Sequence, residues 1–113
     1  MSLVIVTTTL PTEEAADLLA TQLVEDGVAA CVQVIGPIES TYRWEGVVER
    51  SEEYYCHCKA PEEKRDALMA RIKELHPYEV PEIIAVKADA VDAGYLRWAR
   101  TEHLPPQHGM PPR

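Results

Sequence analysis

At 113 residues the chain is long enough for one domain with a hydrophobic core and too short for two. Its formal net charge of −8 argues against nucleic acid or an anionic membrane surface as a partner, because both attract clustered lysine and arginine. No apolar run approaches the length that spans a bilayer, and no basic stretch or cleavage site precedes the first apolar run at residues 3–6. We therefore expect a cytoplasmic protein, whose three cysteines are reduced thiols.

The first elements that the pattern predicts are a buried strand and an amphipathic helix. Residues 3–9 are apolar and then β-branched, which is typical of a strand. Thr12 is followed by two glutamates, so its hydroxyl is expected to cap a helix whose dipole favours those carboxylates. Apolar residues then recur at helical spacing on one face, and Gly27 ends the helix.

A long β-hairpin is predicted next. Residues 28–35 form its first arm, which resumes over residues 38–44 after a bend or bulge at Gly36-Pro37. Glu45-Gly46 is a tight-turn signal, and residues 47–59 return as the third strand. Both arms are longer than the usual strand length of about five or six residues. We therefore expect the hairpin to project beyond its own domain.

The second half of the chain predicts a helix and a fourth strand. Pro61 begins the helix, and His76-Pro77 ends it. Residues 82–88 form the strand, which is apolar at its centre. The buried stripe of the helix is expected to contain Leu68, Ile72 and Leu75.

A short third helix completes the domain. Asp89 or Asp92 can cap it, and it carries Tyr95 and Trp98. We expect a single domain over residues 1–104, followed by a proline-rich disordered tail over residues 105–113.

The order β-α-β-β-α-β-α predicts an α+β fold, a ferredoxin-like split β-α-β sandwich with an antiparallel sheet and an extra C-terminal helix. Helices on one face of such a sheet leave strands that alternate between apolar and polar residues. Residues 4–6, 29–32 and 83–86 are instead apolar throughout. We infer that another copy of the chain covers the second face of the sheet, in an assembly of closed symmetry.

Five segments carry a resemblance to a known family. They are Ala29 to Val32, Tyr42 to Gly46, Glu53 to Lys59, Glu74 to Ile84, and Tyr95-Leu96 with Trp98. Their order and spacing from about Val4 to about Glu102 are similar to those of the divalent-cation tolerance protein family, CutA. The resemblance implies a ferredoxin-like subunit in a homotrimer that is knitted together by the long hairpins. It also implies a shape like that of the PII nitrogen-signalling proteins, a role in tolerance of copper and other divalent ions, and a signalling role, with no reaction assigned.

The segment 75–83 is the part of the chain on which we expect one wall of a ligand site, because Pro77 and Pro81 stiffen it. We predict that the ligand-binding residues are Lys59, Tyr78, Glu82 and Trp98. Lys59 and Glu82 have alternative roles. Lys59 binds an anionic ligand or forms an ion pair, and Glu82 acts as a base, as a ligand, or as a partner for a neighbour's backbone.

His76 and Cys31 are the candidate metal ligands, with a divalent copper ion, Cu²⁺, as the candidate metal. Their alternatives are a histidine that interacts with a helix C-terminus and a small buried thiol. In family members associated with copper, the resemblance implies a cysteine near the end of the first strand and a second histidine before the His-Pro pair. This chain has Thr8 and Leu75 there, and neither is a good copper ligand.

The triplet Cys56-His57-Cys58 looks like a metal clip but is expected not to act as one. On a strand the two cysteines face one side and the histidine faces the other. We therefore interpret the two thiols as packing residues, with a soft-metal site between them as the alternative.

These observations favour a homotrimeric binding or regulatory protein that holds a metal ion or small molecule where subunits meet. The alternative is an enzyme of unknown reaction that uses a cleft between subunits, and strongly shifted pKa values among Glu82, Lys59 and His76 in a concave pocket would favour it. A third interpretation is a scaffold that binds another protein through an exposed apolar patch.

Overall fold

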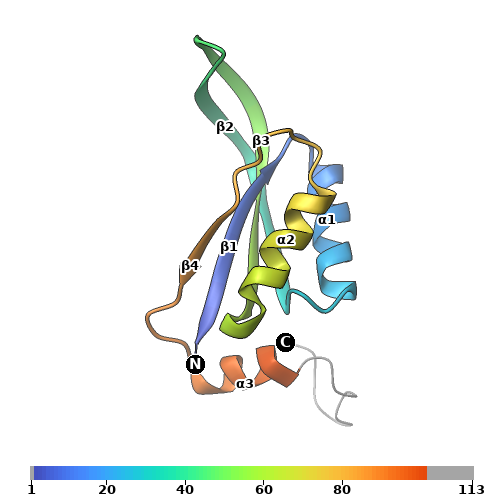
Figure 1. The fold of residues 1–113 in the computed structure, drawn as a ribbon, viewed down its shortest axis with the longest axis vertical. Coiled ribbons are helices and arrows are strands. Elements are labelled where there is room, and N and C mark those ends of the chain that lie inside the picture. Colours follow the sequence, from blue (N-terminus) through green and yellow to red (C-terminus); the bar gives the residue numbers. More distant parts are fainter. Residues whose placement is uncertain (1, 102–113) are drawn as a thin grey trace.

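The computed structural model describes residues 2–101, which form one four-stranded antiparallel sheet in the order β2-β3-β1-β4. Helices α1 and α2 cover one face of the sheet, and α3 lies at the end where the chain begins (Figure 1). This arrangement confirms the predicted ferredoxin-like fold with an extra C-terminal helix. The elements are β1 (Leu3–Leu10), α1 (Glu13–Glu25), β2 (Cys31–Trp44), β3 (Val47–Pro61), a 3₁₀ turn (Glu62–Lys64), α2 (Arg65–Leu75), β4 (Ile84–Lys87) and α3 (Ala93–Thr101).

The helix ends follow from local chemistry. The Thr12 hydroxyl accepts a hydrogen bond from the Ala15 backbone N–H at 3.1 Å, as expected of an N-cap. Gly27 adopts φ +73° just after α1, a left-handed conformation that glycine adopts without strain. Of the two predicted caps of the last helix, Asp92 is the one used, since its Oδ2 accepts from the Tyr95 N–H at 3.0 Å.

The β2–β3 hairpin extends well past the end of β1 and past both helices (Figure 1). Glu45 and Gly46 both have positive φ, as a two-residue turn of type I′ requires. The predicted irregularity at Gly36-Pro37 is confirmed, because the register of β2 against β3 shifts between Ile35 and Ile38. The hairpin is therefore continuous, with one bulge near its middle.

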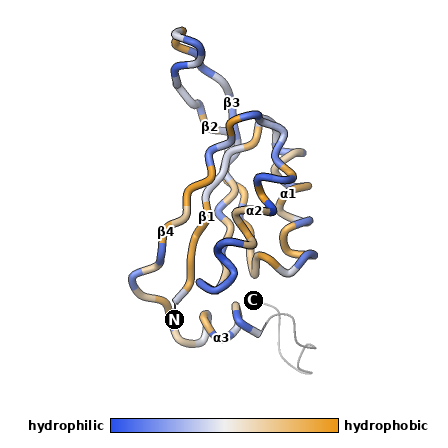
Figure 2. The backbone as a smooth tube through the Cα atoms, in the orientation of Figure 1, coloured by the Kyte–Doolittle hydropathy of each residue, from blue (hydrophilic) through white to orange (hydrophobic). Residues whose placement is uncertain are grey.

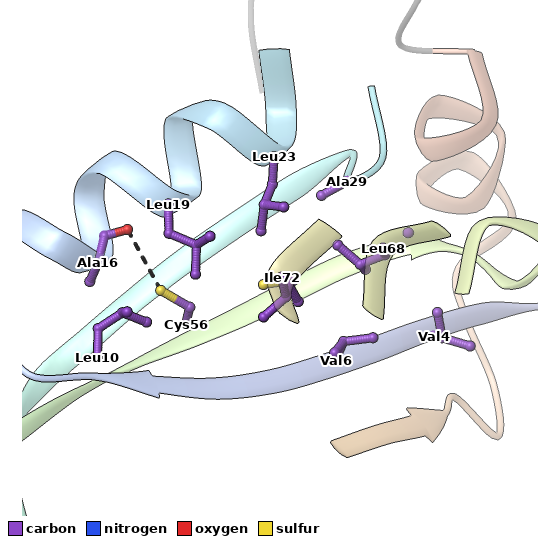
Figure 3. Packing of buried hydrophobic residues seen from close by; sticks show 12 residues of the cluster. Val4, Val6, Leu10, Ala16, Leu19, Leu23, Ala29, Cys56, Leu68 and Ile72 are labelled. Carbon is purple, nitrogen blue, oxygen red and sulfur yellow. Dashed lines mark hydrogen bonds between the residues drawn. The ribbon is translucent and has the colours of Figure 1, made fainter. Parts of the chain in front are cut away.

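The main core lies between the sheet and the helices α1 and α2 (Figure 3). Leu68 and Ile72 of α2 are fully buried against the strands. Cys56 and Cys58 point into this core and are fully buried. His57 lies on the other face, where its Nδ1 forms a hydrogen bond of 3.2 Å with the Thr7 hydroxyl. The predicted separation of the triplet is therefore confirmed. The core residues include Val4, Val6, Leu10, Ala16, Leu19, Leu23, Cys56, Cys58, Leu68 and Ile72.

The opposite face of the sheet carries the side chains that alternate with the core. We call it the open face, and the strand register places on it Thr7, Gln33, Ile35, Tyr55, His57, Ile84 and Val86. Ile84 and Val86 are 54% and 59% exposed, and the hydrophobic colour runs along β4 (Figure 2). The prediction that the second face is apolar is therefore correct for β4, for part of β2 and, at Ile5, for β1. A second cluster, built on Leu3, Ala30 and Ala99, packs α3 against one end of the sheet.

Several element limits differ from the prediction. Residues 28–30 precede β2. The backbone N–H groups of Val28 and Ala29 donate to the Leu23 carbonyl at the end of α1, and that of Ala30 donates to the Lys59 carbonyl of β3. Pro61 ends β3 rather than beginning α2, and a 3₁₀ turn separates the two. Leu75 does not belong to the buried stripe of α2 and is more than a third exposed, because it is the last residue of the helix. The fourth strand is shorter than predicted, and the predicted tail at residues 105–113 lies outside the described residues.

Candidate functional site

A groove of about 860 Å³ lies between the projecting part of the hairpin and the segment that follows α2. This segment passes beside the hairpin on its way to β4 (Figure 1). The groove is lined by Thr9, Ile38, Glu39, Ser40, Thr41, Tyr42, Trp44, Glu53, Tyr55, Pro77, Tyr78, Glu79, Val80 and Glu82. Two of the predicted ligand-binding residues, Tyr78 and Glu82, are therefore brought together.

His76 lies buried next to the groove and joins it to the end of β1. Its Nε2 is 2.8 Å from the Thr9 carbonyl oxygen, and its Nδ1 accepts from the Tyr78 backbone N–H at 3.1 Å. Because Nδ1 is an acceptor, the proton of the neutral ring is on Nε2, which donates to Thr9. Both ring nitrogens are thus used to bind the backbone.

Burial lowers the pKa of His76, and this effect outweighs the Thr9 hydrogen bond and the nearby Glu53 carboxylate, both of which raise it. A neutral ring suits the observed pair of hydrogen bonds, since protonated Nδ1 could not accept one. A metal ion at His76 requires a ring nitrogen with a free lone pair, and neither has one in this arrangement. The metal role of His76 stays a prediction that these hydrogen bonds do not favour.

The partly buried Tyr78 and the buried Glu53 meet in the lining of the groove. The Tyr78 hydroxyl donates to Oε2 of Glu53 at 2.7 Å, and Glu53 is only 7% exposed. Burial raises the pKa of Tyr78 well above its usual value, and the hydrogen bond to Glu53 raises it further. The phenol is therefore a permanent donor at neutral pH, aimed at a carboxylate.

The remaining lining gives the groove its chemical character. Glu79 and Glu82 add carboxylates to that of Glu53, and no lysine, arginine or histidine of residues 2–101 is among the lining residues. Glu39 lines the groove too, but the register turns its side chain to the other face of the hairpin. Tyr42 and Trp44 of β2 line the groove together with Tyr55 and Tyr78. The groove is thus both acidic and aromatic.

The other predicted site residues lie elsewhere. Lys59 is on β3, where its Nζ donates to the Gln33 side chain, and it is directly opposite Cys31 in the register. Trp98 is on α3 and packs in the second cluster, with its ring 5.5 Å from that of Tyr95. Neither residue nor Cys31 lines the groove. The structure thus divides the predicted set between the groove and the α3 end of the sheet.

Glu53 is one of the groove residues that our ligand-binding prediction omitted. It lies in the resembling segment 53–59, but the sequence offers no sign that it meets Tyr78, which is 25 positions away. The signal in the sequence that could have found it is its spacing from Tyr55 and His57, two and four residues further on, which places the three side chains on one face of a strand. Tyr42 and Trp44 were likewise absent from the predicted ligand-binding set.

No group of three or more His, Cys, Asp or Glu side chains within residues 2–101 is arranged to hold a metal ion. Nor is any helix in the same range long and apolar enough to cross a membrane.

Comparison with known proteins gives the family. The family model for the CutA1 divalent ion tolerance protein matches residues 4–102, which are most of the chain. The chain belongs to this family. The divalent-cation tolerance protein CutA of Thermus thermophilus is 40% identical over 96 residues, which are 85% of this chain and 93% of that protein.

Two further CutA relatives show how widely the similarity extends. The rice protein named CutA 1, chloroplastic, is 37% identical over 97 residues, and the match spans 86% of this chain and 55% of the rice protein. The crystal structure of CutA from Xylella fastidiosa superposes with a TM-score of 0.87 at 33% identity, and covers 90% of this chain and 98% of that one. The fold and the family assignment therefore agree.

Proposed function

We propose that the chain acts in divalent-ion tolerance as one subunit of a homotrimer, and that the groove holds a small ligand or metal ion where subunits meet. Membership of the CutA family supports the physiological role. The observation that carries the assembly is the exposed apolar side of the sheet. A signalling role like that of PII proteins is consistent with a ligand groove that borders a subunit contact.

The apolar side of the sheet supports assembly on energetic grounds. Burial of apolar surface contributes about 25 cal/mol per Å², and Ile35, Ile84 and Val86 are each more than half exposed in a single chain. The two outer strands of the sheet, β2 and β4, also have unpaired edges within the chain, which favours pairing with another copy. An assembly of closed symmetry can bury the apolar face of the sheet and pair its free strand edges at the same time.

Sedimentation velocity tests the assembly. We expect the protein to sediment with three times the 12.7 kDa mass of one chain. Val86→Lys places a charge on the open face and should shift the protein towards single chains. Leu18→Lys is the matched control, because Leu18 is 66% exposed on α1, on the helical side of the molecule. A parent protein that sediments as single chains at micromolar concentration would disprove the trimer.

The predicted copper ligands His76 and Cys31 do not line the groove, so copper binding at either of them is tested separately from the groove. A Cu²⁺ ion at His76 would have to displace the Thr9 or the Tyr78 hydrogen bond. We therefore expect calorimetric titration of CuCl₂ to give the same heat for the parent protein and for His76→Ala. A smaller heat for the variant would make His76 a ligand, and the same comparison with Cys31→Ala tests the thiol.

A binding function fits the groove better than an enzyme. General acid–base catalysis uses a group that exchanges protons near the working pH. His76 and Tyr78 both have pKa values shifted towards the neutral form, and their hydrogen bonds fix them in that form. In this arrangement they position neighbouring groups rather than transfer protons.

A further inference from the structure

One of the two carboxylate oxygens of Glu53 accepts no hydrogen bond within residues 2–101. Oε2 accepts the Tyr78 hydroxyl, whereas Oε1 accepts no hydrogen bond from any of these residues. Glu53 is 93% buried and lines the groove. A buried carboxylate is stable when a positive charge or several donors compensate it. Within the described chain it has one neutral donor and no ion-pair partner.

The surroundings of Glu53 complement a positive charge rather than a negative one. Glu79 and Glu82 add two more carboxylates, and no basic residue of the described chain lines the groove to neutralise them. The combined field therefore attracts cations and repels anions.

The aromatic lining distinguishes between kinds of cation. Tyr42 and Trp44 are both more than two-fifths exposed, and their rings line the groove. Aromatic faces attract organic cations, which combine a diffuse positive charge with an apolar body. Hard divalent ions such as Mg²⁺ and Ca²⁺ instead select oxygen ligands and water and make no use of aromatic rings.

We propose that the groove binds an organic ammonium ion, whose nitrogen donates to Oε1 of Glu53 and whose carbon body lies against Tyr42 and Trp44. This inference rests on the proposed function, since it names the class of small ligand that the groove holds. The Tyr78 hydroxyl orients the Glu53 carboxylate, so that Oε1 faces the ligand. The outer carboxylates, such as Glu82, strengthen the attraction of the cation from a longer range.

Calorimetry with two probes of similar shape tests the inference on the assembled protein. Benzylammonium chloride supplies the cation and the ring, and benzyl alcohol supplies the ring without the charge. We expect benzylammonium to bind at least about tenfold more tightly, because a charge-assisted hydrogen bond is stronger than a neutral one. Equal affinity for the two probes would overturn the proposal.

Two glutamine variants locate the site. Glu53→Gln removes the inner carboxylate while preserving its shape, and Glu25→Gln makes the same change of net charge at an exposed position on α1, outside the groove. We expect Glu53→Gln to weaken benzylammonium binding about tenfold or more and Glu25→Gln to leave it unchanged. Equal binding by the two variants would overturn the assignment to Glu53. If Glu53→Gln fails to fold, the exposed groove residue Glu82 replaces it, and Glu82→Gln should weaken binding about two- to fivefold.

The outcomes separate this inference from the proposed function. A trimer that binds CuCl₂ in a Glu53-dependent manner but does not bind benzylammonium would overturn the ligand class and leave a ligand-binding trimer in place. A protein that sediments as single chains would overturn the trimer, whereas benzylammonium binding that depends on Glu53 would still support the groove assignment.

Discussion

The Tyr78 hydroxyl and Oε2 of Glu53 form a 2.7 Å hydrogen bond that joins the segment after α2 to the middle of β3. One partner is a carboxylate that is almost fully buried. The bond therefore both positions the wall of the groove and satisfies a charge that water barely reaches.

Tyr78→Phe should destabilise the protein by about 1–3 kcal/mol, because it leaves the buried carboxylate of Glu53 without its donor. Urea unfolding measures the loss. Tyr42→Phe is the control, since that exposed hydroxyl accepts a hydrogen bond from the Ser51 hydroxyl at the surface, and it should cost less than about 0.5 kcal/mol. In a double-mutant cycle with Glu53→Gln, the absence of coupling would show that the bond contributes nothing.

Stability should fall as the pH is lowered below the ordinary pKa of histidine, because the pKa of His76 is lower in the folded protein than in the unfolded chain. Between the two values the unfolded chain binds the extra proton and the folded protein does not. The stabilisation is therefore complete above about pH 6.5 and is lost progressively below it. Urea unfolding at pH 7.5 and 5.5 measures this effect.

His76→Gln supplies the comparison for that pH series. Glutamine has an amide donor and acceptor but does not titrate, so the variant should lose less stability between pH 7.5 and 5.5 than the parent protein. The other ionisable groups are the same in both proteins, so their contributions cancel in the difference. An identical pH dependence would mean that His76 is not responsible.

Gly36→Ala should destabilise the hairpin by about 1–3 kcal/mol, because a Cβ at this position would overlap the ring of Tyr54. Tyr54 packs against the main core and would have to move away from it. Thermal unfolding of Gly36→Ala measures the loss. In a Tyr54→Ala background, Gly36→Ala should lower the stability of the protein by less. An equal loss of stability in the two backgrounds would mean that the Tyr54 ring is not the cause.

Cys56 and Cys58 should resist alkylation in the native protein. Both are fully buried, and burial raises the pKa of Cys56 to about 11 and that of Cys58 still further. In a Cys31→Ser variant only these two thiols remain, and their native reaction with iodoacetamide should be at least about a hundredfold slower than in guanidinium chloride. Rapid native labelling would contradict the packing in Figure 3.

Local features of the sequence were sufficient for the elements and their order. Thr12, Gly27 and the Glu45-Gly46 pair act on backbone groups within a few residues of themselves, so their roles could be predicted without knowledge of the fold. The alternation of side chains along a strand likewise predicted that Cys56 and Cys58 face away from His57.

The site could be predicted only in part, because its contacts join distant positions. His76 bonds the Thr9 backbone across 67 positions, and Tyr78 meets Glu53 across 25. The predicted group containing Lys59 and Trp98 failed to converge with Tyr78, because strand register and the packing of α3 place those residues at another end of the sheet.

The sequence by itself determined the strands, the helices and the length of the hairpin. Turn residues, helix caps and the spacing of apolar residues depend on interactions between residues that are close together in the sequence. The tertiary structure alone decided that an acidic and aromatic groove forms between the hairpin and the segment after α2. It also decided that both nitrogens of His76 are bound to backbone. Both outcomes depend on how strands pair and where segments cross, and these are set by the packing of the whole domain rather than by neighbours along the chain.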